Sequence, residues 1–301
     1  MKAIGIDIGG TKILVAAVDE SGCVRSQTSF PTEPAAGFRT AVERIADAIV
    51  GITDKVGWRL SDLCGIGIGC TGPVDPKRGT VHNPYTLPTW DGCNLVTAFK
   101  NRFEIPIWLE NDADAAAMGE FHFGAGKGAE PMVMLTFGTG IGFSVIMDGR
   151  IVRGVHGTHP ELGHIPISLD GPLCYCGIRG CFESLASGPA IELAGHPFGL
   201  TSTRAVFEAS HSGNANARQI IDRALFAVAT ATWTLVHIYM PQKIVLGGGI
   251  MHDHFELVAN VMRQSIEKAV LVAKGEIEIA KAALGDSAGV VGAASLVVTR
   301  V

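Results

Sequence analysis

The sequence has little of what marks several large classes of protein. It contains no run of basic residues, and its 29 acidic against 24 basic side chains give a net charge of −5, so we expect no nucleic-acid partner. Only 18% of the 301 residues are charged while 47% are hydrophobic, which excludes a disordered chain. The longest uncharged stretch, residues 224–240, is too short and too polar for a membrane span and predicts a buried helix. We therefore expect a globular protein without a membrane partner.

Two further absences concern the nucleotide and the compartment. Neither G-x-x-x-x-G-K-[ST] nor G-x-G-x-x-G occurs between a strand and a helix, which excludes a P-loop and a dinucleotide fingerprint. Asp7 interrupts the N-terminal apolar stretch before it could form a signal peptide, so we expect a cytoplasmic protein. In that compartment the seven cysteines argue against a disulfide framework. Glycine is abundant instead, at 38 residues, which suggests many tight turns and close backbone approaches.

The order of predicted elements indicates an α/β protein with two similar halves. Residues 3–8 and 13–18 are β-prone runs joined by Gly-Gly-Thr-Lys, and residues 132–147 repeat this hairpin scheme. We also predict strands at 65–69, 105–110 and 243–246, and helices at 36–56 and directly after 113. The predicted domains are residues 1–115, joined by a C-terminal helix at about 287–301, and residues 116–286, which include a Cys/His-rich loop at 156–188.

Three glycine-rich turns are candidates for holding phosphate. Gly9 and Gly10 would let backbone N–H groups face inward, while Thr11 and Lys12 add a hydroxyl and a positive charge. The turn Gly138-Thr139-Gly140 has the same construction. Gly247-Gly248-Gly249 follows a buried strand and precedes a helix, where open α/β sheets bind ligands. Each could be an ordinary turn, but together they suggest a single nucleotide.

Asn111 and Asp112 lie between a predicted strand and an alanine-rich helix. Either residue could simply cap the helix, because Asn and Asp are favoured there. The functional alternative is that Asp112 accepts a proton from a substrate hydroxyl, as phosphoryl transfer to an alcohol requires. The pair alone does not decide between the two.

His164, Cys174, Cys176 and Cys181 lie within 18 residues of a loop dense with Gly and Pro. Four nitrogen and sulfur ligands with no vacancy describe a structural tetrahedral zinc site, and the alternative is four unconnected residues. Glu161 and Glu183 are close to these ligands, so the metal could hold their carboxylates in place; they could also be solvated loop charges. We expect the loop to lie away from the turns at Gly10 and Gly140.

Taken together, the motifs resemble the ROK family of sugar kinases and repressors over almost the whole chain. The matching segments are DIGGTK at 7–12, END at 110–112, GTGIG at 138–142, ELGH at 161–164, CYCGIRGCFE at 174–183 and VLGGG at 245–249. The resemblance implies two RNase-H-like domains of the actin-like ATPase superfamily, with ATP and sugar in the cleft between them, and a homodimer. It also implies a structural Zn²⁺ and an ATP-dependent, Mg²⁺-dependent reaction.

The resemblance assigns roles residue by residue. Asp112 matches the catalytic base, and Asp7 matches the acid beside the phosphates of Mg-ATP. The remaining nucleotide-side residues are Gly9, Gly10, Thr11, Lys12, Gly138, Thr139, Gly140, Gly247 and Gly248. The residues placed around the sugar hydroxyls are Gly72, Asn83, Asn111, Asp112, Glu161, His164 and Glu183. His164 would then serve both metal and sugar.

Two features bear on the substrate. Thr71-Gly72-Pro73 stands where many members have Pro-Gly, and His159-Pro160 resembles fructokinase-like members, whereas the three-cysteine motif resembles glucokinases and N-acetylhexosamine kinases. We expect a kinase for the 6-hydroxyl of a hexose: glucose first, fructose or mannose next, then N-acetylglucosamine or N-acetylmannosamine. A sugar-sensing protein of the repressor branch is disfavoured, because Asp7 leaves no room for a helix-turn-helix before the first strand.

Overall fold

The computed structural model describes residues 2–297, which divide into two compact units. The first unit comprises residues 2–128, 144–159 and 282–297, and the second comprises residues 129–143 and 160–281. The expected boundary between residues 115 and 116 is wrong, because it would cut helix α3 (Asp112–Phe123). The first unit continues to residue 128. The last part of the expected C-terminal helix, residues 298–301, lies outside the described residues.

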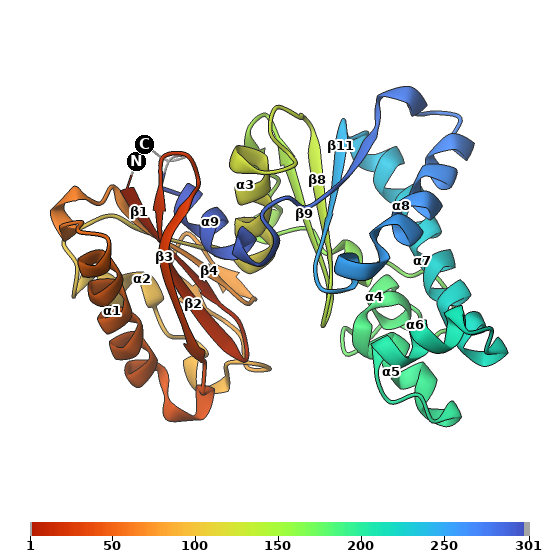
Figure 1. The fold of residues 1–301 in the computed structure, drawn as a ribbon, viewed down its shortest axis with the longest axis horizontal. Coiled ribbons are helices and arrows are strands. Elements are labelled where there is room, and N and C mark those ends of the chain that lie inside the picture. The colour runs from red at the N-terminus through yellow and green to blue at the C-terminus, as the bar shows by residue number, and fades with distance from the viewer. Residues whose placement is uncertain (1, 298–301) are drawn as a thin grey trace. The chain divides into compact units, whose positions relative to one another are not determined.

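A five-stranded sheet organises the first unit (Figure 1). Its order is β3-β2-β1-β4-β7, with β1 (Lys2–Ile8), β2 (Lys12–Asp19), β3 (Val24–Pro31), β4 (Gly65–Cys70) and β7 (Ile107–Asn111). The pairs β1–β2 and β2–β3 are antiparallel, whereas β4 runs parallel to β1 and β7 parallel to β4. The parallel strands β1, β4 and β7 therefore all end at the same edge of the sheet, where Asn111 leads into α3.

Helices cover both faces of this sheet, which explains why its central strands are almost continuously apolar. On one face, α1 (Phe38–Lys55) buries Val42, Ile45 and Ile49 in the main core, close to the short helix α2 (Leu95–Lys100). On the other face, α9 (Ala288–Ser295) packs Val290 and Ala294 into a second core with residues of β1 and β2. The short strands β5 (Val74–Asp75) and β6 (Thr80–Val81) form a separate pair.

Glycines let α9 approach its neighbours closely. A Cβ on Gly5 would collide with the carbonyl of Val290, and a Cβ on Gly292 would collide with the backbone of Ala115 in α3. Gly289 lies against the carboxylate of Asp7 in the same way. The small residues of α9 thus serve packing, and its contact with Asp7 connects it to the candidate site.

The second sheet has the same strand order as the first (Figure 1). It runs β10-β9-β8-β11-β12, with β8 (Met132–Phe137), β9 (Ile141–Met147), β10 (Arg150–Ile151), β11 (Lys243–Gly247) and β12 (Glu278–Lys281). β11 is parallel to both β8 and β12, while β9 and β10 are antiparallel. The repeated order bears out the two similar halves that the duplicated hairpin predicts.

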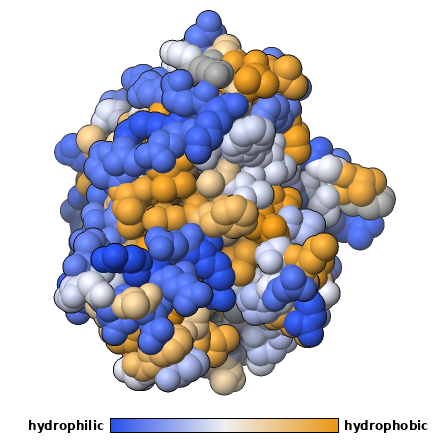
Figure 2. Space-filling model, turned by 90° about the vertical axis from the view of Figure 1, so that its right-hand side faces the viewer, coloured by the Kyte–Doolittle hydropathy of each residue, from blue (hydrophilic) through white to orange (hydrophobic). Residues whose placement is uncertain are grey.

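The helices of the second unit follow the cysteine-rich loop. They are α4 (Phe182–Ala186), α5 (Gly188–Gly195), α6 (Thr203–His211), α7 (Ala215–Tyr239) and α8 (Ile250–Lys268). The expected buried helix at 224–240 forms most of α7, but Phe226 and Trp233 are 62% and 42% exposed. Apolar surface is visible on the face shown in Figure 2. Among the described residues, no helix is long and apolar enough to cross a membrane.

Candidate functional site

The first glycine turn joins β1 to β2 and is fixed by its own backbone. The N–H of Gly9 donates to the carbonyl of Lys12 at 2.9 Å, and the hydroxyl of Thr32 donates to the carbonyl of Gly9 at 2.7 Å. The side chains of Thr11 and Lys12 are exposed. The hydrogen bond from Thr32 therefore stabilises the backbone of the turn. The hydroxyl of Thr11 and the ammonium group of Lys12 stay accessible at its tip.

Two acidic residues of the first unit interact electrostatically beside this turn. Asp7 is on β1, and Asp112 is the first residue of α3. Burial, and then the charge of Asp112, raise the pKa of Asp7 to about 6, while Lys12 acts in the opposite direction. Burial also raises the pKa of Asp112, opposed mainly by the hydrogen bond from the N–H of Ala113. A carboxylate with a raised pKa is a stronger proton acceptor once it is ionised.

The local geometry separates the roles of Asn111 and Asp112. The side-chain oxygen of Asn111 accepts the N–H groups of Ala113 and Asp114 at 2.9 and 3.3 Å, so Asn111 is the N-cap of α3. The helix cap therefore explains Asn111 and does not require Asp112, whose Oδ1 accepts only the adjacent N–H of Ala113 among its described bonds. A carboxylate at the first turn is also favoured by the helix dipole.

The two other residues expected to contact sugar in this unit occupy different surroundings. Gly72 lies close to Asn111, because a Cβ there would come within 2.8 Å of the Asn111 amide nitrogen. Asn83 is buried, and its amide donates to Thr86 Oγ1 at 2.6 Å while accepting the N–H of Thr86 at 3.0 Å. Asn83 thus shapes its own loop, which a sequence motif could not show.

The second and third glycine turns lie together in the second unit. The N–H of Gly138 donates to the carbonyl of Gly140 at 2.9 Å, and the side chain of Thr139 is exposed. Gly248 has φ of +90°, and a Cβ there would collide with the backbone of Phe137, the residue before this turn. Only glycine allows that approach, so Gly247 at the end of β11 and Gly248 form one surface with the turn after β8.

The cysteine-rich loop also reaches this turn, and our expectation that it lies away from Gly140 is wrong. Glu183, two residues beyond Cys181, accepts the N–H of Ile141 at 2.9 Å through Oε2. The same oxygen lies 2.5 Å from the position of a Cβ on Gly140. The separation in sequence was misleading because α4, which carries Glu183, packs back onto the start of β9.

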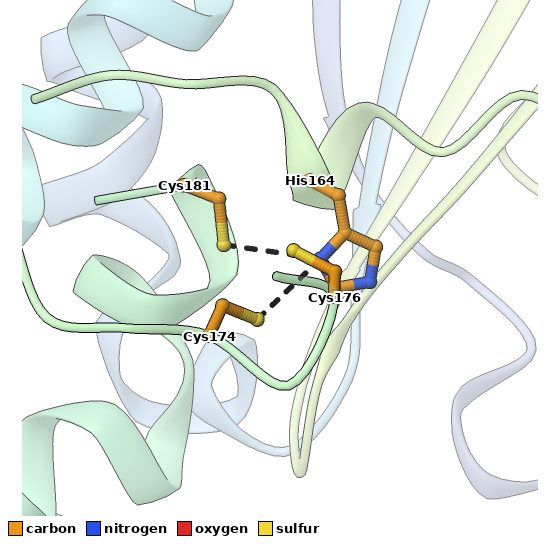
Figure 3. Close-up of side chains that lie close together, drawn as sticks. All are labelled: His164, Cys174, Cys176 and Cys181. Carbon is orange, nitrogen blue, oxygen red and sulfur yellow. Dashed lines mark hydrogen bonds between the residues drawn. The ribbon is translucent and has the colours of Figure 1, made fainter. Parts of the chain in front are cut away.

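The four candidate metal ligands come together as the sequence predicts (Figure 3). One donor atom from each of His164, Cys174, Cys176 and Cys181 lies within 4.8 Å of the others. Nδ1 of His164 faces the sulfur atoms, at 3.8 Å from Sγ of both Cys174 and Cys181. Cys174 and Cys181 are buried, whereas Cys176 is exposed.

The chemistry of this donor set fits zinc. Burial, with a contribution from the neighbouring thiols, raises the pKa of Cys174 to about 12, so this thiol needs a cation to become a thiolate. One imidazole and three sulfurs match a closed tetrahedral site. Nε2 of His164 points elsewhere and lies 3.1 Å from the hydroxyl of Tyr175, in the manner of the outer partners that orient metal-binding histidines. Glu161, at the start of the same short segment, is exposed.

Sequence reasoning missed two residues of the site. Tyr175 stands between two of the cysteines, and its spacing carried no signal of a contact with His164. Arg153 forms ion pairs with Glu110 and Asp114, which flank Asp112 in the sequence. No short motif connects Arg153 with these acids, since 39 to 43 residues separate them.

Comparison with known proteins agrees with this arrangement. The sequence pattern that defines the ROK family matches residues 3–300. The chain belongs to the ROK family. This ROK chain is 33% identical to a glucokinase of Thermotoga maritima, over 100% of the chain and 98% of that relative.

Two solved structures resemble this ROK chain closely. A ROK hexokinase from Thermus thermophilus has a TM-score of 0.86 and 33% identity, covering 98% of the chain and 97% of its own. A ROK family glucokinase from Streptomyces griseus, in complex with glucose and AMPPNP, has a TM-score of 0.78 and 32% identity, covering 98% and 99%. The predicted family and the two-domain α/β fold of the actin-like ATPases are thereby confirmed.

Proposed function

We propose that this ROK protein is a sugar kinase that transfers a phosphoryl group from ATP to the 6-hydroxyl of a hexose, with glucose preferred. The observation that carries the proposal is the pair Asp7 and Asp112, two acids with raised pKa values beside the turn that presents Thr11 and Lys12. The family comparison supports the substrate class, because relatives along the full chain are glucokinases and one of them binds glucose and AMPPNP.

In this mechanism Asp112 accepts the proton of the sugar hydroxyl, whose oxygen forms a bond to the terminal phosphorus of ATP while the bond from that phosphorus to the bridging oxygen breaks and ADP leaves. We assign the phosphates to the turns at Gly9–Lys12 and Gly138–Gly140, and the nucleoside side to Gly247 and Gly248. Asn111 and Gly72 of the first unit, and Glu161, His164 and Glu183 of the second, would bind sugar hydroxyls. Mg²⁺ would neutralise charge on the phosphates when bound, and the Asp7 carboxylate is the group suited to hold it.

Asp112→Asn tests the proposal. The amide has nearly the size of the carboxylate but cannot take the proton, so we expect kcat to fall by about 10²–10⁴-fold while sugar still binds. Asp47→Asn, at an exposed position of α1, is the matched control and should keep normal turnover. Near-normal kcat in Asp112→Asn would contradict the assignment of the base.

The choice of hexose is a separate proposal with its own assay. ADP release measured with glucose, fructose, mannose, N-acetylglucosamine and N-acetylmannosamine should give the highest kcat/KM for glucose. Fructose is the second candidate, because His159-Pro160 resembles fructokinase-like members. With polyphosphate in place of ATP, direct detection of the sugar phosphate should find no product. Because this activity needs ATP, the protein must work in a compartment that contains it, and we propose the cytoplasm.

We propose that His164, Cys174, Cys176 and Cys181 bind one structural Zn²⁺ ion. All four positions are filled by protein, so the ion has no vacancy for substrate and stabilises the loop that carries Glu161 and Glu183. Metal analysis after reducing, chelator-free purification should find about one zinc per chain. A preparation that is active and free of zinc would overturn this assignment.

We also propose a homodimer that uses the exposed stripe of α7. Phe226 and Trp233 are seven residues apart in α7, which places them on one side of the helix, and both are exposed, as is Met240 directly after the helix. Exposed apolar side chains in a row are typical of protein interfaces. Light scattering should give the mass of two chains, and Phe226→Glu with Trp233→Glu should give the mass of one.

A further inference from the structure

Arg153 holds two buried carboxylates at once. Its NH2 lies 2.6 Å from Glu110 Oε1, and its NH1 pairs with Asp114 Oδ2. The side chains of Glu110 and Asp114 are 1% and 0% exposed, and that of Arg153 is 22% exposed. Buried carboxylates are costly unless they are paired, so this guanidinium is the counter-charge that offsets the burial of both acids. Burial raises the pKa of Glu110, and the charge of Arg153 acts to lower it.

The two acids bracket Asp112 in the chain. Glu110 belongs to the end of β7, and Asp114 is in the first turn of α3, each two residues from Asp112. Glu110 Oε1, the atom paired with Arg153, also accepts the N–H of Asn111 at 2.9 Å. Asn111 in turn caps α3 through the N–H of Asp114. Arg153 therefore connects the end of the strand with the start of the helix at the point where Asp112 stands.

The geometry points to Arg153 as a positioning residue for phosphoryl transfer, which fixes the β7–α3 corner and through it the carboxylate of Asp112 and the amide of Asn111. This inference rests on the proposed function, in which Asp112 is the base. Arg153 approaches this corner from the segment after β10 (Arg150–Ile151) in the same unit. Its side chain thus connects the segment after β10 with the β7–α3 corner, which is distant in sequence.

Arginine suits this position better than lysine. Its planar fork offers several donors in fixed directions and can contact two different carboxylates, whereas the ammonium group of lysine is a compact point charge. Arg153→Lys would keep the positive charge and lose the bridge. The pair of variants Arg153→Lys and Arg153→Met therefore separates charge from geometry.

The charges around Asp112 determine how the loss of Arg153 should change the pH dependence of catalysis. Glu110 and Asp114 flank it, Asp7 faces it from β1 and His159 from the following segment, and Lys12 lies near Asp7. Asp114 already acts to raise the pKa of Asp112, and Arg153 is its ion-pair partner. Removing the guanidinium leaves that negative charge uncompensated, so the pKa of Asp112 should rise further.

Steady-state kinetics of both variants tests the inference. We expect Arg153→Lys to retain the melting temperature within a few degrees but to lose about 10- to 100-fold in kcat, with a higher KM for sugar and an unchanged affinity for ATP. Arg153→Met should show the same losses and, in addition, an acid limb of the kcat/KM profile displaced to higher pH. Arg150→Met, an exposed arginine on β10, is the matched control and should behave like the parent.

A purely structural role gives a different pattern. It would lower kcat only in proportion to the folded fraction and leave the KM for sugar and the pH profile unchanged, and that result would overturn the inference. Parent-like kinetics in Arg153→Lys would also overturn it, and this variant decides the question where Arg153→Met does not fold. Failure of the proposed function is recognised separately, because the parent would then release no ADP with any hexose, and a wrong assignment of the base would show as parent-like turnover of Asp112→Asn.

Discussion

Replacing Asp7 by Asn should stabilise the folded protein and at the same time impair catalysis. The carboxyl group is partly buried on β1, faces Asp112, and lies against Gly289 of α9. Burial and the Asp112 charge raise its pKa from 3.8 to about 6. The difference is about 2 units, and at about 1.4 kcal/mol per unit the ionised group costs the folded state about 3 kcal/mol.

The sign of the pH dependence follows from this shift. The folded state binds the proton of Asp7 more tightly than the unfolded state, so the stabilising contribution is complete below pH 3.8 and is lost as the pH rises through 6. Asparagine has nearly the same size and no charge, so it should avoid the loss. The free energy of unfolding of Asp7→Asn should therefore exceed that of the parent by an amount that grows between pH 4 and 6 and stays near 3 kcal/mol above pH 7.

Urea unfolding followed by tryptophan fluorescence can measure this in the relevant unit. Three of the four tryptophans, Trp58, Trp90 and Trp108, lie in the first unit, so a Trp233→Phe background reports on that unit alone. Asp47→Asn, at an exposed site on α1, should change the free energy of unfolding by less than about 0.5 kcal/mol. Turnover of Asp7→Asn should fall by about 100-fold, because a charged group near the phosphates is lost.

The result that would refute this reasoning is equal stability of Asp7→Asn and the parent at pH 8, or a difference that does not change with pH. Either result would mean that ionised Asp7 does not destabilise the fold. The pKa of Asp7 would then be close to its ordinary value, and its interaction with Asp112 would be weak.

Three further outcomes follow from the second unit. Tyr175→Phe removes the hydroxyl that lies 3.1 Å from Nε2 of His164 and orients its ring. Since a hydrogen bond contributes about 0.5–1.5 kcal/mol, the KM for sugar should rise by about 2- to 10-fold at unchanged kcat, and a parent-like KM would contradict this. Gly140→Ala places a Cβ 2.5 Å from Glu183 Oε2, so initial-rate kinetics should show a higher KM for both ATP and sugar, and a parent-like KM for either would count against the contact. Cys176→Ser should lose zinc in metal analysis and weaken ATP binding in calorimetry as well as sugar binding, because Glu183 connects the loop to the phosphate turn; intact ATP binding would show that the two are independent.

The sequence allowed most strands and the Cys/His cluster to be predicted, because both are local. The apolar runs at 65–69 and 243–246 appear as β4 and β11 within one residue at either end. The four candidate metal ligands lie in one loop, so their spacing alone predicted that they meet. Periodicity and short motifs report such features well, since every contributing residue is near in the chain.

The rest depended on contacts between distant segments. The boundary of the first unit could not be found from composition, because α3 belongs to it through packing against α9. Arg153 gave no signal, because the sequence does not show which buried acids an arginine will reach. The contact of Glu183 with Ile141 was missed for the same reason. Each of these is a tertiary contact whose partners share no periodic pattern.

The place of α9 also affects how the protein folds as it is synthesised. One face of the first sheet is covered by α1, which is made soon after β1 to β3, but the other face must wait for Val290 and Ala294. Until residues 288–297 emerge from the ribosome, the apolar side chains of Ala3, Leu14 and Val18 have no cover. A nascent chain with that face exposed is a natural client for a chaperone, and the first half of the protein can complete its core only after the second half has been made.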